Sequence, residues 1–524
     1  MMNVSETEFG LVADLIHDHA AQAPERRALV CGGHTLSYSA LDALMDRVAC
    51  ALQRDGVRAG DAIAICAGTS IDYAAVFLGA LRAGIAVAPL APSSSASSLW
   101  RMVADAGARL LFVDADVAAA LDAAAPIPAV AAVPRIALDG SAAGRPLADW
   151  LAPEGSRPAP VALGPADPFN IIYSSGTTGE PKGIVQGHGM RWSHVRRGAA
   201  FGYGPDSVTL LATPLYSNTT LVTFFPTLAF GGTVVLMPKF DALRYLELAQ
   251  AEHVTHTMLV PVQYQRIMAR PEFGRFDLSA YRFKFCTSAP FSAALKADVL
   301  ARWPGGLVEY YGMTEGGGTC ILQAHLHPDK LHTVGQPAAG HDIRLIDDFG
   351  TEALPGEAGE VVGHSPGMMT GYHGQPEQTR AAEWFSPEGK RFIRTGDIGR
   401  FDADGFLTLF DRKKDMIISG GFNIYPSDLE AVLREHPVVA DAAVVGVPSE
   451  AWGETPVAFV VRRPGSDTSA DASAGALLAW FNARVGKTQR LADLVLLGEL
   501  PRSAIGKVLK RELRERWIGN PTRA

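Results

Sequence analysis

The residues best suited to chemistry lie in one run, Ser174–Gly183, which reads Ser-Ser-Gly-Thr-Thr-Gly-Glu-Pro-Lys-Gly. Glycines let a backbone approach an anion closely, while amide N–H groups and hydroxyls supply hydrogen-bond donors to it. The apolar stretch Phe169–Tyr173 directly before the run predicts a buried strand. We therefore predict a polyphosphate-binding loop at the end of that strand; a surface loop without a ligand remains the alternative for this run taken alone.

The spacing excludes a Walker-type phosphate loop. That loop requires Gly-x4-Gly-Lys-Ser/Thr, whereas counting from Gly176 leads to Pro181–Gly183. The Gly-Lys-Thr at Gly486–Thr488 has Phe481 where the first glycine should stand. The glycine-rich run therefore belongs to a different class of phosphate-binding loop.

Further motifs follow the loop in order along the chain. Tyr310–Glu315 reads Tyr-Tyr-Gly-Met-Thr-Glu, Thr395–Asp397 reads Thr-Gly-Asp, and Lys507 stands further downstream. Together these motifs resemble the adenylate-forming superfamily of acyl- and aryl-CoA synthetases, adenylation domains of peptide synthetases, and luciferases. The resemblance extends over essentially the whole chain. It implies that a carboxylate reacts with ATP to give acyl-AMP and pyrophosphate, after which a thiol attacks the acyl group.

The resemblance assigns most of these residues to the nucleotide. Tyr311 would stack on adenine, Thr314 would contact the α-phosphate, and Glu315 would hold Mg²⁺, since a carboxylate beside phosphates needs a cation between them. Asp397, an acceptor-only group, suits the two ribose hydroxyls. The other residues implied in ATP and AMP binding are Ser174, Ser175, Gly176, Thr177, Thr178, Gly179, Lys182, Gly312 and Arg412.

Lys507 is implied as a catalytic residue, together with Thr314 and Glu315. In the family this lysine reaches the acyl carboxylate and the α-phosphate, where it stabilises the charge that develops as pyrophosphate leaves. We expect Lys510 to be a solvated lysine at the start of a helix. Because two half-reactions share one site, the resemblance also implies that the small domain rotates at a hinge residue, Lys414.

Several residues favour CoA as the thiol substrate. Ser419, Gly420 and Gly421 would line a tunnel for pantetheine, because glycines permit the close approach of a narrow chain. Trp452 resembles a residue that packs on the CoA nucleotide in aryl-CoA ligases, and Arg490 could meet the 3′-phosphate. A core tryptophan and a surface arginine are equally open alternatives for these two residues.

The resemblance also implies a pocket for the acid, where this chain departs from the family pattern. Ser217 stands where many acyl-CoA ligases have histidine, which leaves gating of the thiol tunnel by an imidazole open. Glycines 316–318 remove side-chain bulk and would admit an aromatic ring or an aliphatic tail. We expect a hydrophobic acid, aromatic or medium-chain. The implied pocket residues are Tyr216, Ser217, Asn218, Phe224, Thr287, Ser288, Ala289, Met313 and Gly317.

The elements that must position these residues alternate between helix and strand. Apolar residues recur at helical spacing over Leu41–Leu52, with Ser39 placed to cap that helix and Gly56 to end it. This alternation predicts parallel strands with helices on both faces. The further predicted elements are strands at 61–66, 85–89, 110–113, 208–212 and 232–237, and helices at 71–83 and about 220–230.

A second, smaller αβ domain should begin near Arg412, because Asp411–Asp415 is a charged segment between two apolar runs. We therefore predict an α/β protein with two domains. Layered αβ subdomains make up a large AMP- and acid-binding domain at 1–411, and a small mobile domain at 412–524 carries the hinge and the catalytic lysine. The elements predicted in the small domain are helices at 427–435 and 474–485 and strands at 442–447, 456–461 and 494–497.

The bulk properties fit a soluble enzyme. At 524 residues, 48% of them hydrophobic, the chain can bury a large core. A formal charge of −8 without a long basic run argues against nucleic acid. The 5 cysteines are scattered without metal-ligand spacing, as in a reducing cytoplasm. Met1–Gly10 shows no secretory signal, and the best apolar stretch, Tyr73–Pro89, is too short to span a membrane.

We therefore expect a cytoplasmic protein, monomeric or homodimeric, whose partners are a small carboxylic acid and CoA. One alternative keeps the fold and changes the acceptor, giving a stand-alone adenylation enzyme that loads a carrier-protein thiol. Another is a non-catalytic nucleotide-binding relative. The presence of both Lys507 and Glu315 argues against the latter, since a protein that only binds needs neither.

Overall fold

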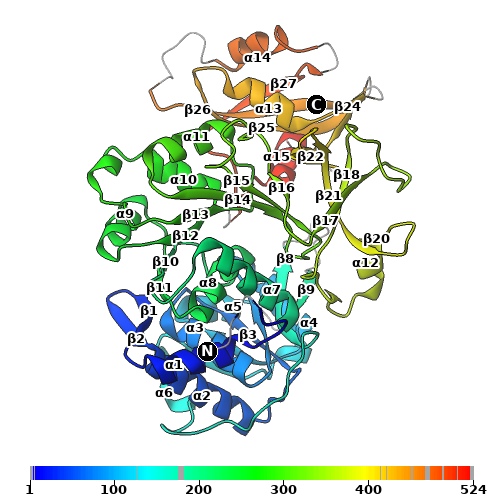
Figure 1. Cartoon of the computed structure of the whole chain (residues 1–524). Coiled ribbons are helices and arrows are strands. Elements are labelled where there is room, and N and C mark those ends of the chain that lie inside the picture. Colours follow the sequence, from blue (N-terminus) through cyan, green and yellow to red (C-terminus); the bar gives the residue numbers. More distant parts are fainter. Residues whose placement is uncertain are drawn as a thin grey trace. The chain divides into compact units, whose positions relative to one another are not determined.

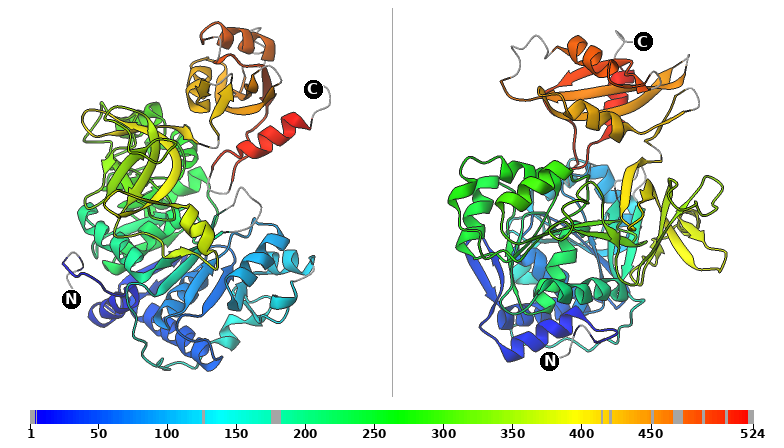
Figure 2. Two further views of the ribbon diagram at one scale, coloured as in Figure 1. Left: turned by 90° about the vertical axis from the view of Figure 1, so that its right-hand side faces the viewer. Right: turned by 45° about the horizontal axis from the view of Figure 1, so that its top comes forward.

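A computed structural model of the chain forms two compact units, Met1–Ile343 with Gly363–Ile393 and Arg344–Val362 with Arg394–Ala524. Figures 1 and 2 show the helices and strands of both units. The structure describes residues 4, 6–124, 127–174, 182–413, 415–419, 422–449, 452–465, 473–486, 489–503 and 506–519.

The first unit contains a large sheet with the strand order β16-β15-β14-β13-β12-β10-β11-β1-β2. Neighbouring strands from β14 through β1 are parallel, and the outer pairs β14–β15, β15–β16 and β1–β2 are antiparallel. The strands are β1 (Arg27–Cys31), β2 (His34–Ser37), β10 (Val208–Leu211), β11 (Thr233–Leu236), β12 (His256–Leu259), β13 (Phe283–Cys286), β14 (Gly306–Gly312), β15 (Thr319–Gln323) and β16 (Gln336–Pro337).

A second sheet in this unit has the order β19-β9-β8-β4-β3-β5-β6-β7. Its strands from β8 through β7 are parallel, whereas β8 and β9 form an antiparallel hairpin to which β19 adds. The strands are β3 (Ala62–Cys66), β4 (Ala86–Pro89), β5 (Ala108–Val113), β6 (Arg135–Ala137), β7 (Arg145–Pro146), β8 (Pro168–Ser174), β9 (Lys182–Gly187) and β19 (Gly371–Tyr372).

Helices lie on both faces of these sheets, as the alternation of elements predicted (Figure 1). Helices α1, α2, α3 and α8 share one core with both sheets, which includes Tyr38, Phe77, Phe169, Phe225 and Val234. Helices α4 and α5 cover the other face of the second sheet. The helices of the unit are α1 (Val12–Gln22), α2 (Tyr38–Arg54), α3 (Ile71–Arg82), α4 (Ala96–Asp105), α5 (Ala115–Asp122), α6 (Leu147–Trp150), α7 (His188–Gly198), α8 (Asn218–Ala229), α9 (Ala242–Ala251), α10 (Pro261–Met268), α11 (Ala293–Arg302) and α12 (Pro376–Ala381).

Local signals begin and end these helices, with one correction. Ser37, not Ser39, caps α2: its hydroxyl accepts from the Ala40 amide, and its backbone has the extended conformation of an N-cap. The prediction of Ser39 is wrong because the helix already begins at Tyr38. Gly56, with φ +78°, follows the end of α2 as predicted.

The boundary between the two units runs through a third sheet, with the order β17-β18-β21-β20 and β22 paired to β21. Residues on both sides of the boundary lie in β17, β18 and β21. The strands are β17 (Asp342–Ile346), β18 (Gly359–His364), β20 (Glu383–Phe385), β21 (Arg391–Phe401) and β22 (Leu407–Arg412). The predicted domain boundary at 411/412 stays a prediction.

The rest of the second unit is a sheet in the order β24-β23-β26-β25, with β27 on β26. Helices α13 and α14 pack on one face, and α15 packs through Leu513 on the other. The helices and strands predicted here are confirmed. They are β23 (Ile417–Ser419), β24 (Phe422–Ile424), α13 (Pro426–Arg434), β25 (Val439–Ser449), β26 (Gly453–Arg462), α14 (Ala474–Asn482), β27 (Asp493–Leu497) and α15 (Lys510–Ile518).

No helix among the described residues is both long and apolar enough to cross a bilayer. The same residues contain no cluster of His, Cys, Asp and Glu side chains suited to binding a metal ion by themselves. All five cysteines are free thiols.

Candidate active site

The glycine-rich run joins two paired strands. β8 and β9 pair antiparallel up to Ser174 and Lys182, which lie opposite each other at the end of the hairpin. The strand predicted before the loop is therefore confirmed. The predicted phosphate-binding residues Ser175, Gly176, Thr177, Thr178 and Gly179 lie outside the described residues, as does the side chain of Ser174.

Lys182 and Glu315 are joined through a tyrosine that the sequence did not single out. The Lys182 Nζ lies 5.4 Å from the ring centroid of Tyr372, within range of a cation–π interaction. The Tyr372 hydroxyl donates to Glu315 Oε1 at 2.9 Å. Burial, followed by the nearby charge of Glu315, raises the pKa of Tyr372, so its hydroxyl stays protonated and remains a donor. Pairing of β19 with β9 places Tyr372 there, a long-range contact without a local signal.

Glu315 lies in the turn that joins β14 to β15. Its carbonyl accepts from the Met369 amide at 2.8 Å, and the Gly316 carbonyl accepts from the Ser365 hydroxyl at 2.7 Å. Gly316 has φ +75°, and a Cβ there would lie 2.0 Å from the Gly367 carbonyl oxygen. Only glycine fits this position. The segment around residues 365–369 therefore fixes the turn from one side.

A buried network of side chains fixes Thr314 from the other side. Gln186 on β9 donates to the Thr314 carbonyl at 2.6 Å and lies 3.5 Å from Asn218 Oδ1. Gln186 Oε1 accepts from Asn170 at 2.9 Å and also from Arg191. Arg191 Nε in turn donates to Asn170 Oδ1 at 2.9 Å. Because all three network residues are buried, the hairpin that carries the glycine-rich loop is firmly linked to Thr314 and, more weakly, to Asn218.

Two of the segments predicted to line the acid pocket meet. Tyr216–Asn218 leads into α8, and Thr287–Ala289 follows β13. The hydroxyls of Thr219 and Ser288 form a hydrogen bond of 2.5 Å between these segments. Ser288 has φ +82°, a left-handed conformation that costs free energy for a residue with a side chain. Contact of these residues with an acid stays a prediction.

Phe224 and Gly317 are placed differently from the rest of the predicted pocket. Phe224 belongs to the core between the two large sheets, with its ring 5.2 Å from that of Phe225. A Cβ at Gly317 would lie 2.5 Å from the Cβ of Ile393. Packing against Ile393 is therefore one reason for glycine at this position, and its role in admitting the acid stays a prediction. Met313 packs against the same cluster.

The two residues predicted at the ribose lie opposite each other in the second unit. In the pairing of β21 with β22, Asp397 faces Arg412, whose side chain is outside the described part. The Asp397 amide donates to the Thr395 hydroxyl at 3.0 Å, and that hydroxyl donates to the Val361 carbonyl at 2.8 Å. Strand pairing therefore brings together the Thr-Gly-Asp motif and the start of the charged segment.

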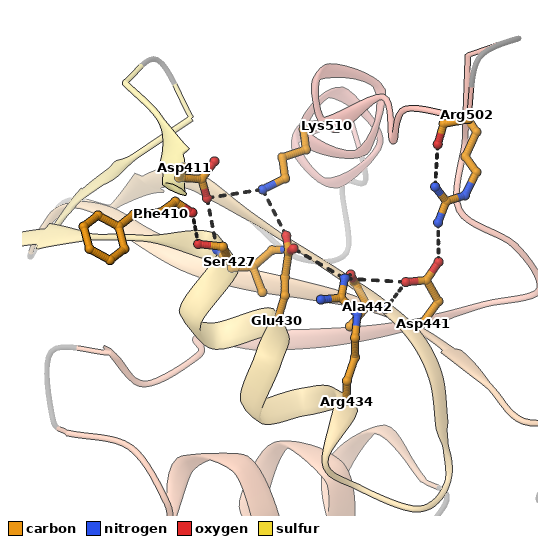
Figure 3. Close-up of polar contacts among 11 residues, drawn as sticks. Phe410, Asp411, Ser427, Glu430, Arg434, Asp441, Ala442, Arg502 and Lys510 are labelled. Atoms are coloured by element: carbon orange, nitrogen blue, oxygen red, sulfur yellow. Dashed lines mark hydrogen bonds and ion pairs between the residues drawn. The ribbon is translucent and has the colours of Figure 1, made fainter. Parts of the chain in front are cut away.

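The exposed Lys507 stands in a tight loop that its own residues close. The Ser503 amide donates to the Lys507 carbonyl at 2.8 Å, and the Lys507 amide donates to the Ser503 hydroxyl at 3.2 Å. Arg502 donates to the Gly506 carbonyl at 2.6 Å and pairs with Asp441 on β25 (Figure 3). The body of the second unit therefore holds the base of this loop.

Lys510 is not the solvated lysine that we expected. Its side chain is 18% exposed, and its Nζ lies 3.0 Å from Glu430 Oε1 and 3.7 Å from Asp411 Oδ2 (Figure 3). Burial alone would lower the pKa of Lys510, but the charges of Glu430 and Asp411 outweigh it and raise that pKa. Asp411 also accepts from the Ser427 amide at 3.0 Å. Lys510 thus ties the start of α15 to α13 and to the end of β22, just before the predicted hinge residue Lys414, which is outside the described residues.

The structure brings two of the predicted CoA-binding residues, Ser419 and Trp452, near each other. Ser419, which is buried, pairs with Phe422 on β24 and with Gly453 on β26. Trp452, directly before Gly453, is 45% exposed, so a large aromatic surface is available beside this strand pairing. Gly420 and Gly421 are not among the described residues. Arg490 is exposed in the segment between α14 and β27.

Replacing Lys510 by methionine should destabilise the second unit. Asp411 and Glu430 would lose the buried ammonium group that they share, and removing one partner of a buried ion pair typically costs about 3–5 kcal/mol. Calorimetry should show that the second unit unfolds at a temperature several degrees lower than in the wild-type protein. Proteolysis should then cut more readily within residues 394–519. Arg511→Met is the matched control, because Arg511 pairs with Glu515 on the exposed face of α15. Equal unfolding of the two variants would contradict a structural role for Lys510.

The chain matches one protein family over most of its length. "AMP-binding enzyme" matches residues 16–373, and "AMP-binding enzyme C-terminal domain" matches residues 428–507. Feruloyl-CoA synthase from Amycolatopsis sp is 34% identical over 512 residues, 95% of this chain and 97% of that protein. The fatty acid–[acyl-carrier-protein] ligase ScoC from Streptomyces coeruleorubidus is 32% identical over 517 residues, 96% of each protein. ATP-bound MatB from Rhodopseudomonas palustris superposes with a TM-score of 0.86 at 29% identity, covering 97% of this chain and 99% of that one. The resemblance that the motifs indicated is confirmed, and the chain belongs to the AMP-binding enzyme family.

Proposed function

We propose that the protein is an AMP-forming carboxylic acid:CoA ligase, which activates a hydrophobic carboxylic acid as acyl-AMP and transfers the acyl group to CoA. The observation that carries this proposal is the contact chain from Lys182 through Tyr372 to Glu315, at the end of the hairpin that bears the glycine-rich loop. A cation and a carboxylate placed around one tyrosine suit a triphosphate and its magnesium ion.

The nucleotide roles follow from this arrangement. The amides and hydroxyls of the glycine-rich loop bind the outer phosphates, Lys182 lies near the leaving pyrophosphate, and Thr314 contacts the α-phosphate. Tyr311 stacks on adenine. Asp397, opposite Arg412 in the strand pairing, accepts from the ribose hydroxyls.

The residues present fit a magnesium ion. In phosphate-binding sites Mg²⁺ is held by one or two carboxylates together with substrate phosphates and water. Glu315 offers one carboxylate, and the Tyr372 hydroxyl orients it by donating to one of its oxygens. Bound there, the ion would neutralise charge on the phosphates.

Adenylation is a displacement at phosphorus. A carboxylate oxygen of the acid bonds to the α-phosphorus, the bond to the β-phosphate oxygen breaks, and pyrophosphate leaves. Lys507 stabilises the negative charge of this transition state, a contribution typically worth about 10²–10³ in rate. The thiol sulfur of CoA then bonds to the acyl carbon, AMP leaves with the former carboxylate oxygen, and the thiol proton is lost to solvent. The second step requires residues 412–524 to rotate at Lys414.

CoA is the proposed acceptor, since Trp452 exposes an aromatic surface directly before Gly453, the partner of Ser419, and the CoA nucleotide would pack on that surface. A carrier-protein thiol is the second candidate, because ScoC, a relative named for that acceptor, is 32% identical to this chain. The enzyme is purified with acyl-AMP bound, and free CoA is added. If the acyl group is not transferred to CoA, the carrier protein is favoured as the acceptor. We also infer a cytoplasmic location, which the free thiols of all five cysteines favour.

Lys507→Ala should abolish adenylation while sparing thioester formation from supplied acyl-AMP. The lysine stabilises charge only in the first step, so pyrophosphate release with aromatic and medium-chain acids should fall by about 10²-fold or more. Lys239→Ala, which changes an exposed lysine outside the proposed site, is the control. Equal loss of both half-reactions would contradict the assignment of Lys507 to adenylation. If none of the tested acids caused the wild-type protein to release pyrophosphate, the proposed function would be contradicted.

Lys414→Pro provides the reciprocal measurement. A proline restricts the backbone rotation on which thiolation depends, so this variant should keep pyrophosphate release and lose CoA thioester formation. Normal thioester formation by this variant would show that the hinge lies elsewhere.

Tyr372→Phe should weaken the use of MgATP. The substitution removes the hydroxyl that donates to Glu315, and a hydrogen bond to a charged group contributes about 1.5–3 kcal/mol. We expect kcat/KM for MgATP to fall by about tenfold or more, with little change in the KM for the acid. Tyr281→Phe is the matched control, because it removes a buried hydroxyl that pairs with Tyr245 instead. Equal effects of the two variants would indicate that Tyr372 only supports the fold.

A further inference from the structure

Four basic side chains gather next to the strands that flank the Tyr311–Glu315 motif. The Arg197 guanidinium carbon lies 5.8 Å over the ring of Tyr310 on β14. His341 Nδ1 accepts from the Thr319 amide, the first residue of β15, at 2.9 Å. We call this group the basic cluster, and its members are Arg191, His194 and Arg197 on α7 and His341 directly before β17.

The basic cluster adjoins the segments assigned to the acid. Tyr310 precedes the Tyr311–Glu315 motif, and Thr319 follows glycines 316–318. Arg191 donates to Gln186, whose amide group reaches both Thr314 and Asn218. The cluster therefore contacts residues next to these segments, namely Tyr310, Thr319 and Gln186.

The half-buried Arg197 differs from other cations of the first unit, which have acidic partners or several neutral acceptors. Lys296 pairs with Glu309, and Arg82 pairs with two aspartates. Lys284 donates to three backbone carbonyls at 2.6–3.2 Å. Arg197, by contrast, has no hydrogen bond or ion pair with any described residue, and Arg191 has only amide oxygens as acceptors.

Unpaired polar atoms point to a missing acceptor. Within the described part of the chain, Arg191 Nη1 and His194 Nδ1 are buried without a hydrogen-bond partner. Burial lowers the pKa of Arg191 to about 9 and also lowers the pKa of Arg197, yet both stay charged at neutral pH. Burial and then the two arginines lower the pKa of His194, which is therefore neutral. Uncompensated positive charge of this kind is costly unless an anion arrives.

Aromatic side chains border the cluster. Tyr310, under Arg197, packs against Phe285 and Phe201, with ring centroids 5.6 and 6.1 Å apart. These rings belong to a buried hydrophobic cluster, and in such apolar surroundings a cation favours an anionic partner.

We propose that Arg197, supported by the rest of the basic cluster, binds a second carboxylate at the far end of the substrate, so that the substrate is a dicarboxylic acid with an aromatic or medium-chain body. This inference rests on the proposed function, because it identifies the acid that the ligase activates. A guanidinium binds a carboxylate through two parallel hydrogen bonds, which gives both affinity and orientation.

Matched acids test the proposal. Pyrophosphate release is measured with cinnamate, 4-hydroxycinnamate and 4-carboxycinnamate, and with octanoate and its diacid, suberate. The wild-type protein should show a kcat/KM for each diacid about tenfold or more above that of its monoacid. Arg197→Met should remove this preference while retaining turnover of the monoacids, which also shows that the variant folds. Arg197→Lys should retain part of the preference.

Arg196→Met is the matched control, since Arg196 is the exposed neighbour of Arg197 on the same helix and should leave the preference unchanged. The inference would be overturned if the wild-type protein preferred the monoacids, or if Arg197→Met and Arg196→Met lost the preference for diacids equally. Either result would leave the proposed function standing. A preference for 4-hydroxycinnamate over 4-carboxycinnamate would also overturn it, in favour of a hydroxyl. Absence of pyrophosphate release with every acid would instead refute the proposed function, and this inference with it.

Discussion

The hydrogen bond from Gln186 to the Thr314 carbonyl is the interaction on which the rest of the site depends. Gln186 lies on β9 of one large sheet, and Thr314 lies in the turn after β14 of the other. The Tyr372–Glu315 hydrogen bond and the Met369–Glu315 backbone hydrogen bond hold the same turn to the β19 segment, which pairs with β9. These hydrogen bonds therefore fix the turn relative to β9, the strand that follows the glycine-rich run.

This linkage requires polar groups to be buried deep in the protein. Gln186 and Asn170 are 0% exposed and Arg191 is 1% exposed, so each unpaired atom in their network costs free energy. The second unit holds its functional loop differently, through ion pairs that bind Arg502 and Lys510 to acidic residues. Local contacts therefore hold the predicted site residues within each unit, as the proposed rotation between the two half-reactions requires.

The sequence predicted what depends on local patterns. Sequence patterns located α3, α13 and the strand before the glycine-rich loop, and Gly56, which has a positive φ, follows the end of α2 as expected. The cap of α2 was misplaced because pairing of Ser37 with Arg27 extends β2 to the first turn of the helix. Tyr372 and the partners of Lys510 could not be predicted, since strand pairing and packing between distant segments place them.

Hydrogen–deuterium exchange with MgATP tests most directly whether the hairpin and the turn act as one phosphate site. Amides of residues 182–187 and 313–316 should gain protection together, at the same nucleotide concentration. The variant Gln186→Leu lacks the hydrogen bond to Thr314. In this variant, amides of the hairpin should still gain protection, while protection of the turn should require a higher nucleotide concentration. Protection of only one segment in the wild-type protein, or joint protection that survives in Gln186→Leu unchanged, would contradict the account.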